Sequence, residues 1–423
     1  MTAGLLELVV SRDNMMAALK RVMANKGSHG VDEMRVDELP AYLSSAWPTI
    51  RQSLLEGTYV PRPVRRVEIP KPDGGVRLLG IPTAVDRLIQ QAVAQVLLPI
   101  FDEGFSAHSY GFRPGRRAHD AVKAAQRYIQ EGYDWVVDID LEKFFDRVNH
   151  DKLMARIARR VSDKRVCALV RRYLESGVLV NGVCLSSDEG TPQGGPISPL
   201  LANIMLDDLD RELEKRGHRF CRYADDCNIY VGSRRAGERV MRSISRYIKD
   251  RLSLTVNEGK SAVDRPWKRK FLGFSFYVGK QGVGIRIHPR SVDRVKSKVR
   301  SVTNRNRSMS MEERFNRLNS ITMGLTNYFG LADAKGLLRD LDQWIRRRIR
   351  ACYWKQWKRV GTKHDNLVRL GIEDSQAWRW ANSRKGCWRI AGSQILSISL
   401  TNAYLEAQGL ASLSRRYSEL RYS

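Results

Sequence analysis

Two adjacent carboxylates, Asp225 and Asp226, are the residues of this sequence best suited to chemistry. They follow Tyr223 and Ala224 and lie between two short runs rich in β-forming residues, 219–222 and 227–231. A two-residue connection of this composition is typical of a hairpin turn, so an ordinary turn is one interpretation. A third carboxylate on another strand favours metal binding, because converging carboxylates repel each other unless cations lie between them. Mg²⁺ suits ligands that offer only oxygen.

The third carboxylate belongs to a predicted strand over residues 135–140. Asp138 and Asp140 are two residues apart, so both side chains point to the same face of a sheet. Neither would be buried there unpaired without a cost in free energy. If this strand lies beside the 227–231 strand, Asp140, Asp225 and Asp226 could hold two ions about 3.5–4 Å apart, as in-line phosphoryl transfer requires.

The elements that must position these acids alternate between strands and helices. A β-hairpin is predicted around residues 71–75, a helix over 86–98, and a Gly/Pro-rich loop at 190–195 that leads into a helix from Pro199. A second strand pair surrounds residues 279–282. Helical spacing of apolar residues then continues to 360, and a small helical region rich in tryptophan and basic residues follows 361.

The charge of the chain indicates a polyanionic partner. Lys and Arg number 73 against 46 Asp and Glu, a formal net charge of +27. Residues 285–360 alone hold 19 basic and six acidic side chains, which suits helices that follow a phosphate backbone better than merely solvated ones. No apolar run approaches the roughly 20 residues that span a bilayer, and no secretory signal is evident, so we expect a cytoplasmic protein with no membrane partner. The six scattered cysteines disfavour a zinc site.

Taken together, these motifs resemble those of reverse transcriptases encoded by bacterial group II introns. The matching segments, in chain order, are 25–32, 65–82, 109–115, 138–146, 190–199, 223–226 and 271–274. Each segment alone is a weak signal, but seven in the family's order over nearly the whole chain are specific. No HNH endonuclease is expected after residue 423, which resembles the class C introns.

The resemblance implies an α+β fold of the right-hand polymerase type, with fingers, an antiparallel palm sheet, a helical thumb and a small helical C-terminal domain. The implied boundaries are 1–60 for an N-terminal extension that contacts template or RNA, 61–285 for fingers and palm, 286–360 for the thumb or maturase domain, and 361–423 for a DNA-binding-like domain. The implied activity is RNA-directed DNA synthesis by two-metal nucleotidyl transfer, with intron RNA bound for splicing and retrohoming.

The resemblance also implies roles for single residues. Asp140, Asp225 and Asp226 would be the metal ligands, and Lys260 would be a general acid toward pyrophosphate. Nucleotide-binding residues would be Lys71, Arg77, Gln193 and Phe145, the last as a steric gate against the 2′-hydroxyl, although an ordinary core aromatic remains an alternative. Nucleic-acid contacts would come from Asn25, Lys26, Gly27, Arg113, Phe271, Leu272, Gly273, Arg346, Arg347 and Arg350.

The implied cofactors and substrates are two Mg²⁺ ions and deoxynucleoside triphosphates, and the implied partners are group II intron RNA, an RNA template with a DNA primer, and target DNA. A free-standing enzyme co-opted for phage defence, CRISPR adaptation or DNA repair is the alternative reading. A splicing factor with an inactive polymerase core is another, but it would require a lost metal ligand, and all three acids are present. The sequence leaves the oligomeric state open.

Overall fold

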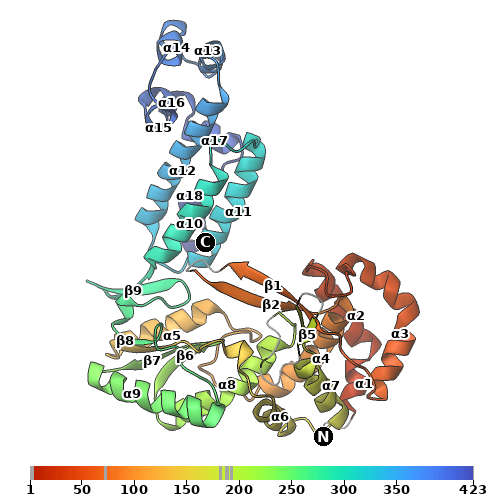
Figure 1. Cartoon of the computed structure of the whole chain (residues 1–423). Helices are drawn as coiled ribbons and strands as arrows, with labels where there is room; N and C mark the ends of the chain where they lie inside the picture. The colour runs from red at the N-terminus through yellow and green to blue at the C-terminus, as the bar shows by residue number, and fades with distance from the viewer. Residues whose placement is uncertain (1–3, 71–73, 181–182, 186–189, 191–193, 423) are drawn as a thin grey trace. The chain divides into compact units, whose positions relative to one another are not determined.

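The computed structural model describes residues 4–70, 74–180, 183–185, 190 and 194–422 of the chain. Two compact units are present, Met1–Arg265 and Pro266–Ser423. Helices predominate and the small sheets are mainly antiparallel, which confirms the predicted α+β class (Figure 1). None of the described helices has the length and apolar composition needed to cross a membrane.

The first unit begins with helices, and the first two of them pack against a long helix, α4. In chain order the elements are α1 (Leu5–Val9), α2 (Arg12–Ala24), η1 (Val36–Glu38), α3 (Leu39–Leu55) and α4 (Ala84–Asp102). The Thr83 hydroxyl starts α4 by accepting a hydrogen bond from the Asp86 backbone N–H. Leu88, Ile89 and Val93 are among its buried residues, at the spacing of one helical face. The helix predicted over residues 86–98 is therefore confirmed.

A four-stranded sheet with the order β2-β1-β4-β5 contains the predicted hairpin. Its strands are β1 (Val64–Pro70), β2 (Val76–Ile81), β4 (Val178–Val180) and β5 (Val183–Leu185). β1 and β2 pair antiparallel from Arg65 opposite Ile81 to Pro70 opposite Val76, whereas β1 and β4 pair parallel. The turn chemistry of residues 71–75 was thus enough to identify the hairpin.

The second sheet of this unit carries the acidic residues, and we call it the palm sheet. Its order is β6-β7-β3-β8, and every neighbouring pair is antiparallel. The strands are β6 (Arg219–Tyr223), β7 (Asp226–Val231), β3 (Trp135–Ile139) and β8 (Ala262–Asp264). Val137 and Ile139 of β3 are buried in the core of the unit, so Asp138 and Asp140 belong to the opposite face.

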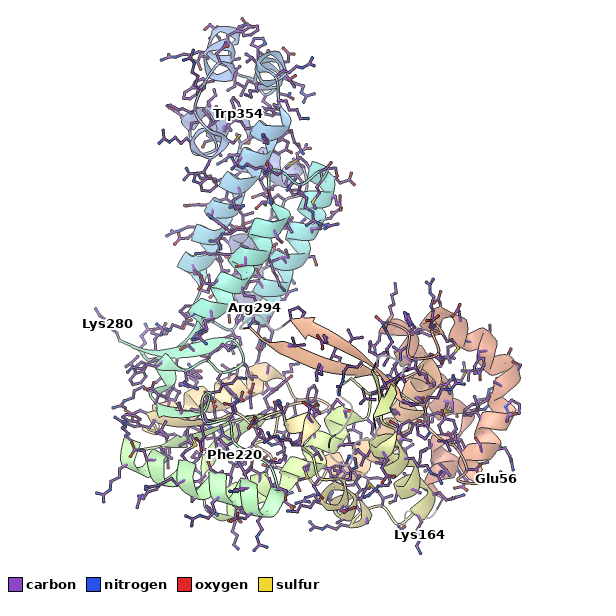
Figure 2. All side chains as sticks on the ribbon, viewed as in Figure 1. Glu56, Lys164, Phe220, Lys280, Arg294 and Trp354 are labelled. Carbon is purple, nitrogen blue, oxygen red and sulfur yellow. The ribbon has the colours of Figure 1, made fainter. Side chains whose placement is uncertain are left out.

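Helices cover both faces of the palm sheet (Figure 1). α5 (Ala118–Gln130) packs on β6 and β7 from one face, and α8 (Ser198–Lys215) and α9 (Arg234–Tyr247) pack on the other. The remaining helices of this part of the chain are η2 (Phe144–Asp146), α6 (His150–Ala158), α7 (Lys164–Glu175) and η3 (Ile248–Leu252). α9 approaches the Val137 face so closely that a Cβ on Gly237 would lie 2.5 Å from Val263 Cγ1. Tyr128 of α5 contacts Tyr230, with ring centroids 5.7 Å apart. Phe220 of β6 is fully buried in the core of this unit (Figure 2).

The second unit combines a β-hairpin with long helices. Its first elements are η4 (Pro266–Lys268), β9 (Phe274–Gly279), β10 (Gly282–Ile287), α10 (Pro289–Val302), α11 (Met311–Phe329) and α12 (Lys335–Gln356). Lys280 is at the tip of the hairpin, and Arg294 lies on α10 (Figure 2). The hairpin, which we predicted within the palm segment, groups with the helices that follow it.

Short helices complete this unit, and the last of them packs against the long helices near its start. They are α13 (Val360–Arg369), α14 (Asp374–Ala381), α15 (Cys387–Ile390), α16 (Gln394–Ser399), α17 (Asn402–Ala407) and α18 (Leu413–Tyr422). α18 packs on α11 and α12. Asp342 of α12 accepts hydrogen bonds from the backbone N–H groups of Leu413 and Ser414, both at 2.9 Å. A boundary at residue 360 therefore does not separate α18 from the helices before it.

Candidate active site

The turn between β6 and β7 presents Asp225 and Asp226 at one end of the palm sheet. Tyr223 pairs with Asp226 across the turn, so Ala224 and Asp225 are its two central residues. Ala224 has a φ of 58°, in the left-handed region, which costs a non-glycine residue roughly 1–2 kcal/mol. Asp225 is half-buried and Asp226 is exposed. The predicted hairpin turn is confirmed, in a conformation that its surroundings must maintain.

The strand register brings the third carboxylate to the same place. Ile139 of β3 pairs with Cys227 of β7. Continued one residue past the end of β3, this register sets the backbone of Asp140 opposite Asp226. Asp138 pairs with Asn228, two residues deeper in the sheet on the same face. The register therefore brings the backbones of the three predicted ligands to one end of the palm sheet, and Asp138 lies further from the turn.

The segment after η3 holds the backbone of Asp140. The Asn257 N–H donates to Asp140 O at 2.8 Å, and the Asp140 N–H donates to Ser261 Oγ at 3.0 Å. Lys260 Nζ lies 3.8 Å from Asp140 Oδ1, and its side chain is 62% exposed. The structure therefore places Lys260 beside a predicted metal ligand, where its ammonium group faces solvent.

The predicted 109–115 motif packs against the turn between β6 and β7. Its backbone runs parallel to β6, with the Tyr110 N–H donating to Arg222 O and the Arg222 N–H donating to His108 O, both at 2.9 Å. A Cβ on Gly111 would lie 2.4 Å from Ala224 N. Only glycine allows this approach, because any side chain would displace the turn.

A buried guanidinium beneath the turn is the feature that sequence reasoning missed. Arg222 is 0% exposed and pairs with Asp210 of α8. It also donates to Asn203 Oδ1 at 3.0 Å, Ala224 O at 2.9 Å and Ser109 Oγ at 2.9 Å. One signal was available: Arg222 has the same strand parity as the core residue Phe220, which is an unusual position for a charge.

The predicted nucleotide-binding loop begins and ends in close contacts. A Cβ on Gly190 would lie 2.9 Å from Phe145 O, and the Gly190 N–H donates to Val148 O at 2.8 Å. At the other end, a Cβ on Gly194 would lie 2.8 Å from Gly80 O of β2. Gly190 therefore lies against the segment that contains Phe145, and Gly194 lies against β2 of the hairpin sheet. Gln193 and Lys71 lie outside the described residues, and for Arg77 the structure gives only its pairing with Ile69.

Phe145 stands at the edge of the core. Its ring is half-buried and meets Phe144 edge-on, with centroids 5.2 Å apart. Phe144 is fully buried, whereas Phe145 only packs against the core cluster. This partial exposure is compatible with both the gate and the core-aromatic interpretations.

The predicted nucleic-acid contacts of the first unit fall into two groups. Lys26 and Gly27 line a cavity of about 630 Å³ together with His29, Arg35 and Arg65, and Asn25 ends α2 next to it. Arg113 differs, because its side chain is only 5% exposed and pairs with Asp102 at 2.6 Å. Its remaining nitrogens donate to backbone carbonyls. These contacts give Arg113 a structural role that we did not predict.

In the second unit, Phe271, Leu272 and Gly273, which are predicted to contact nucleic acid, form a tight bend before β9. Leu272 and Gly273 both have positive φ, and Phe271 is buried. Tyr328 of α11 donates to Leu272 O at 2.8 Å, and Ser291 of α10 donates to Gly273 O at 2.9 Å. The bend is thus built into the base of the long helices.

The basic residues predicted on α12 make internal contacts. Arg347 lies over the Trp388 ring at 4.2 Å and donates to Trp388 O at 3.1 Å. Arg350 donates to Leu400 O at 3.0 Å, and burial lowers its pKa. Arg346 is half-buried. Arg347 and Arg350 therefore attach the C-terminal helices to α12, a role that their spacing alone did not reveal.

The metal prediction can be tested against the donor groups present. The side chains of Asp140, Asp225 and Asp226 offer only carboxylate oxygens, which suit a hard divalent cation. Within the described part of the chain, no three Asp, Glu, His or Cys side chains are already gathered as a metal site. The donor chemistry therefore fits divalent ions, whereas a closed ligand cage is absent from the described residues.

Two family models match the chain in sequence order. Residues 69–276 match the reverse transcriptase (RNA-dependent DNA polymerase) family, and residues 292–371 match the group II intron maturase-specific domain. The first match spans the palm sheet and, from the end of β1 onward, the other strands of the hairpin sheet, and the second spans most of α10 to α13. The two matches agree with the resemblance recognised from the motifs.

Curated relatives include proteins of group II introns. Protein YkfC of Escherichia coli is 38% identical over 218 residues, which are 50% of this chain and 57% of that protein. The group II intron-encoded protein LtrA of Lactococcus lactis is 38% identical over 200 residues, 47% of this chain and 33% of LtrA. The chain thus spans about a third to just over half the length of these two relatives.

A chain of a solved partial Cas6-RT-Cas1–Cas2 complex is 26% identical, with a TM-score of 0.38, and the match covers 58% of this chain and 42% of that one. That likeness is too low to add to the assignment, which the family models, the motif order and the acids of the palm sheet carry. The chain belongs to the group II intron-type reverse transcriptases, with a reverse transcriptase domain followed by a group II intron maturase-specific domain.

Proposed function

We propose that this protein is an RNA-directed DNA polymerase that extends a DNA primer on an RNA template and also binds group II intron RNA. The observation that carries the polymerase proposal is the strand register that brings Asp140 to the same end of the palm sheet as Asp225 and Asp226. A deoxynucleoside triphosphate would be the substrate, and the reaction would join its α-phosphorus to the primer 3′-oxygen as pyrophosphate departs.

Asp140, Asp225 and Asp226 would hold two divalent ions, with Mg²⁺ the cation their oxygens favour. Bound there, the ions would supply the positive charge that favours the attacking 3′-oxygen and the departing pyrophosphate. The chain itself orients the acids: Asn257 and Ser261 hold Asp140 through its backbone, and Arg222 holds Ala224 next to Asp225. Lys260, with its exposed ammonium group, would donate a proton toward the leaving group.

The binding of nucleic acid has its own support in the second unit. Arg305, Arg384, Lys385 and Arg389 line a concavity of about 770 Å³ with Trp388, and we call it the basic concavity. None of these four cations has an acidic partner within the described residues. Burial lowers the pKa of the adjacent Arg348, and repulsion from Arg300 and Arg305 adds to the effect. Unneutralised cations beside a partly exposed indole suit a phosphate backbone and a stacked base.

Primer extension tests the proposal directly. We expect the full chain to extend a DNA primer annealed to RNA when deoxynucleotides and Mg²⁺ are present, and excess EDTA to stop it. Asp225→Asn should abolish extension because it removes one anionic ligand, while RNA affinity stays near that of the parent. Asp293→Asn on α10 is the matched control, since Asp293 is an exposed aspartate far along the sequence. Sustained extension by the Asp225 variant, or none by the parent, would refute the proposal.

A further inference from the structure

The Arg222 guanidinium uses every donor it has on three separate parts of the first unit. Nε donates to Asp210 Oδ1 at 2.7 Å, and Nη2 donates to Asp210 Oδ2 at 2.5 Å. Nη1 donates to Asn203 and to Ala224 O, and Nη2 also donates to Ser109. Five N–H groups therefore make five bonds, the full capacity of the side chain. They join α8, the 108–111 segment and the turn between β6 and β7.

Stability alone does not account for this pair. Arg222 and Asp210 are both 0% exposed, and burying two charges costs free energy that their attraction only partly recovers. Apolar side chains of similar volume often serve as well in a core. Apolar side chains, however, cannot donate a hydrogen bond that fixes the position of a backbone carbonyl oxygen. Arg222 donates such a bond to Ala224 O at 2.9 Å.

The position of this bond matters because the turn is strained. Ala224 has a left-handed φ and is followed directly by Asp225. Gly111 packs on Ala224 N, and Asn203, which accepts a bond from Arg222, donates to Gly111 O at 2.9 Å. The same network therefore holds both the turn and the segment that presses on it. Arg222 has the parity of Phe220 on β6, so its side chain lies on the face opposite the acids and does not reach a substrate.

We propose that Arg222, supported by Asp210, is a positioning residue: it sets the geometry of the Ala224–Asp225 turn and thereby the place where Asp225 and Asp226 meet Asp140. This inference rests on the proposed polymerase function and adds a residue to it. Groups that orient a metal ligand typically contribute about 10- to 100-fold in metal affinity or activity. The loss should fall on kcat and on the magnesium requirement, while the KM for nucleotide changes little.

Arg222→Lys tests the proposal, because lysine keeps the charge beside Asp210 and loses the fork that reaches Ala224 O. We expect kcat for primer extension to fall about 10- to 100-fold and the half-saturating Mg²⁺ concentration to rise, with the thermal unfolding midpoint measured in parallel. Arg314→Lys is the matched control: Arg314 is a buried arginine of α11 whose bonds go to the carbonyls of Val302, Asn304 and Arg307. It should leave the Mg²⁺ requirement unchanged.

Should Arg222→Lys unfold, the double variant Arg222→Met with Asp210→Leu carries the same expectation in a core without charges. A folded variant of either kind with the parent's kcat and Mg²⁺ dependence would overturn the positioning role. A parent chain that extends no primer would instead refute the polymerase function. The two failures are therefore distinguishable.

Discussion

Replacing Arg384, Lys385 and Arg389 by alanine removes three cations from the basic concavity and leaves Trp388 in place. All three side chains are exposed, and none has an ion-pair partner among the described residues. The substitutions therefore break no internal contact between charges, and the fold of the second unit should persist. The effect expected is on the binding of single-stranded nucleic acid.

The magnitude follows from counterion release. Each phosphate neutralised on a single strand contributes about 0.7 to the slope of log affinity against log salt. Loss of three contacts should therefore lower the slope by up to about 2. Between 50 and 200 mM salt, a fourfold change, the affinity of the parent should fall up to about 20-fold more than that of the variant.

The assay is fluorescence anisotropy of labelled 12-nucleotide DNA and RNA strands across this salt range, with a DNA duplex for comparison. The control removes three cations from α9 by Arg235→Ala, Arg239→Ala and Arg242→Ala. Those side chains are also exposed, but they line none of the cavities described. If the slope of log affinity against log salt fell equally in both triple variants, the loss of net positive charge alone would explain the effect. An unchanged slope in the first would refute the assignment of the basic concavity to nucleic acid.

Two further predictions concern the palm sheet. Gly111→Ala should reduce primer extension at least tenfold, because the new Cβ would lie 2.4 Å from Ala224 N and must displace the turn. The control is Gly324→Ala on α11, where a Cβ meets nothing within 4 Å. Equal activity of the two variants would contradict the close-contact argument. Phe145→Ala should raise the incorporation of ribonucleotides relative to deoxynucleotides severalfold, as competition assays can measure, since it removes the half-buried ring proposed to exclude a 2′-hydroxyl. Unaltered sugar selectivity would leave Phe145 as a core aromatic.

Much of the first unit follows from local patterns. The hairpin around 71–75, the helix over 86–98 and the strand that begins at Trp135 could all be read from turn residues and periodicity. The boundaries of β3, β6 and β7 agree with the predicted ones to within one residue, because β-forming residues are frequent there, whereas β8 was not predicted. The region after residue 360 was less predictable. Its short helices are defined by packing, and the return of α18 to α12 depends on the buried Asp342, which no local pattern indicates.

The charge pattern led to the proposed polyanionic partner but was a poor guide to individual residues. Arg347 and Arg350 were predicted from their basic surroundings and Arg113 from its motif, yet each donates to carbonyl oxygens inside its own unit. A guanidinium has five donors and a long apolar stem, so it can serve as an internal connector as readily as a surface charge. Which role it takes depends on whether carbonyl groups lie within reach, and that is known only after folding.

The sequence by itself determined the chemistry: three carboxylates in two strands, a Gly/Pro-rich loop between them along the chain, and an excess of cations toward the C-terminus. These are properties of residue type and order. Only the tertiary structure decided how the acids are held. The bond from Arg222 to Ser109 spans 113 positions, and the one to Asp210 spans 12. Strand parity placed Arg222 toward the core, but its partners come from a helix and a loop that reach it only when the sheet and α8 pack together.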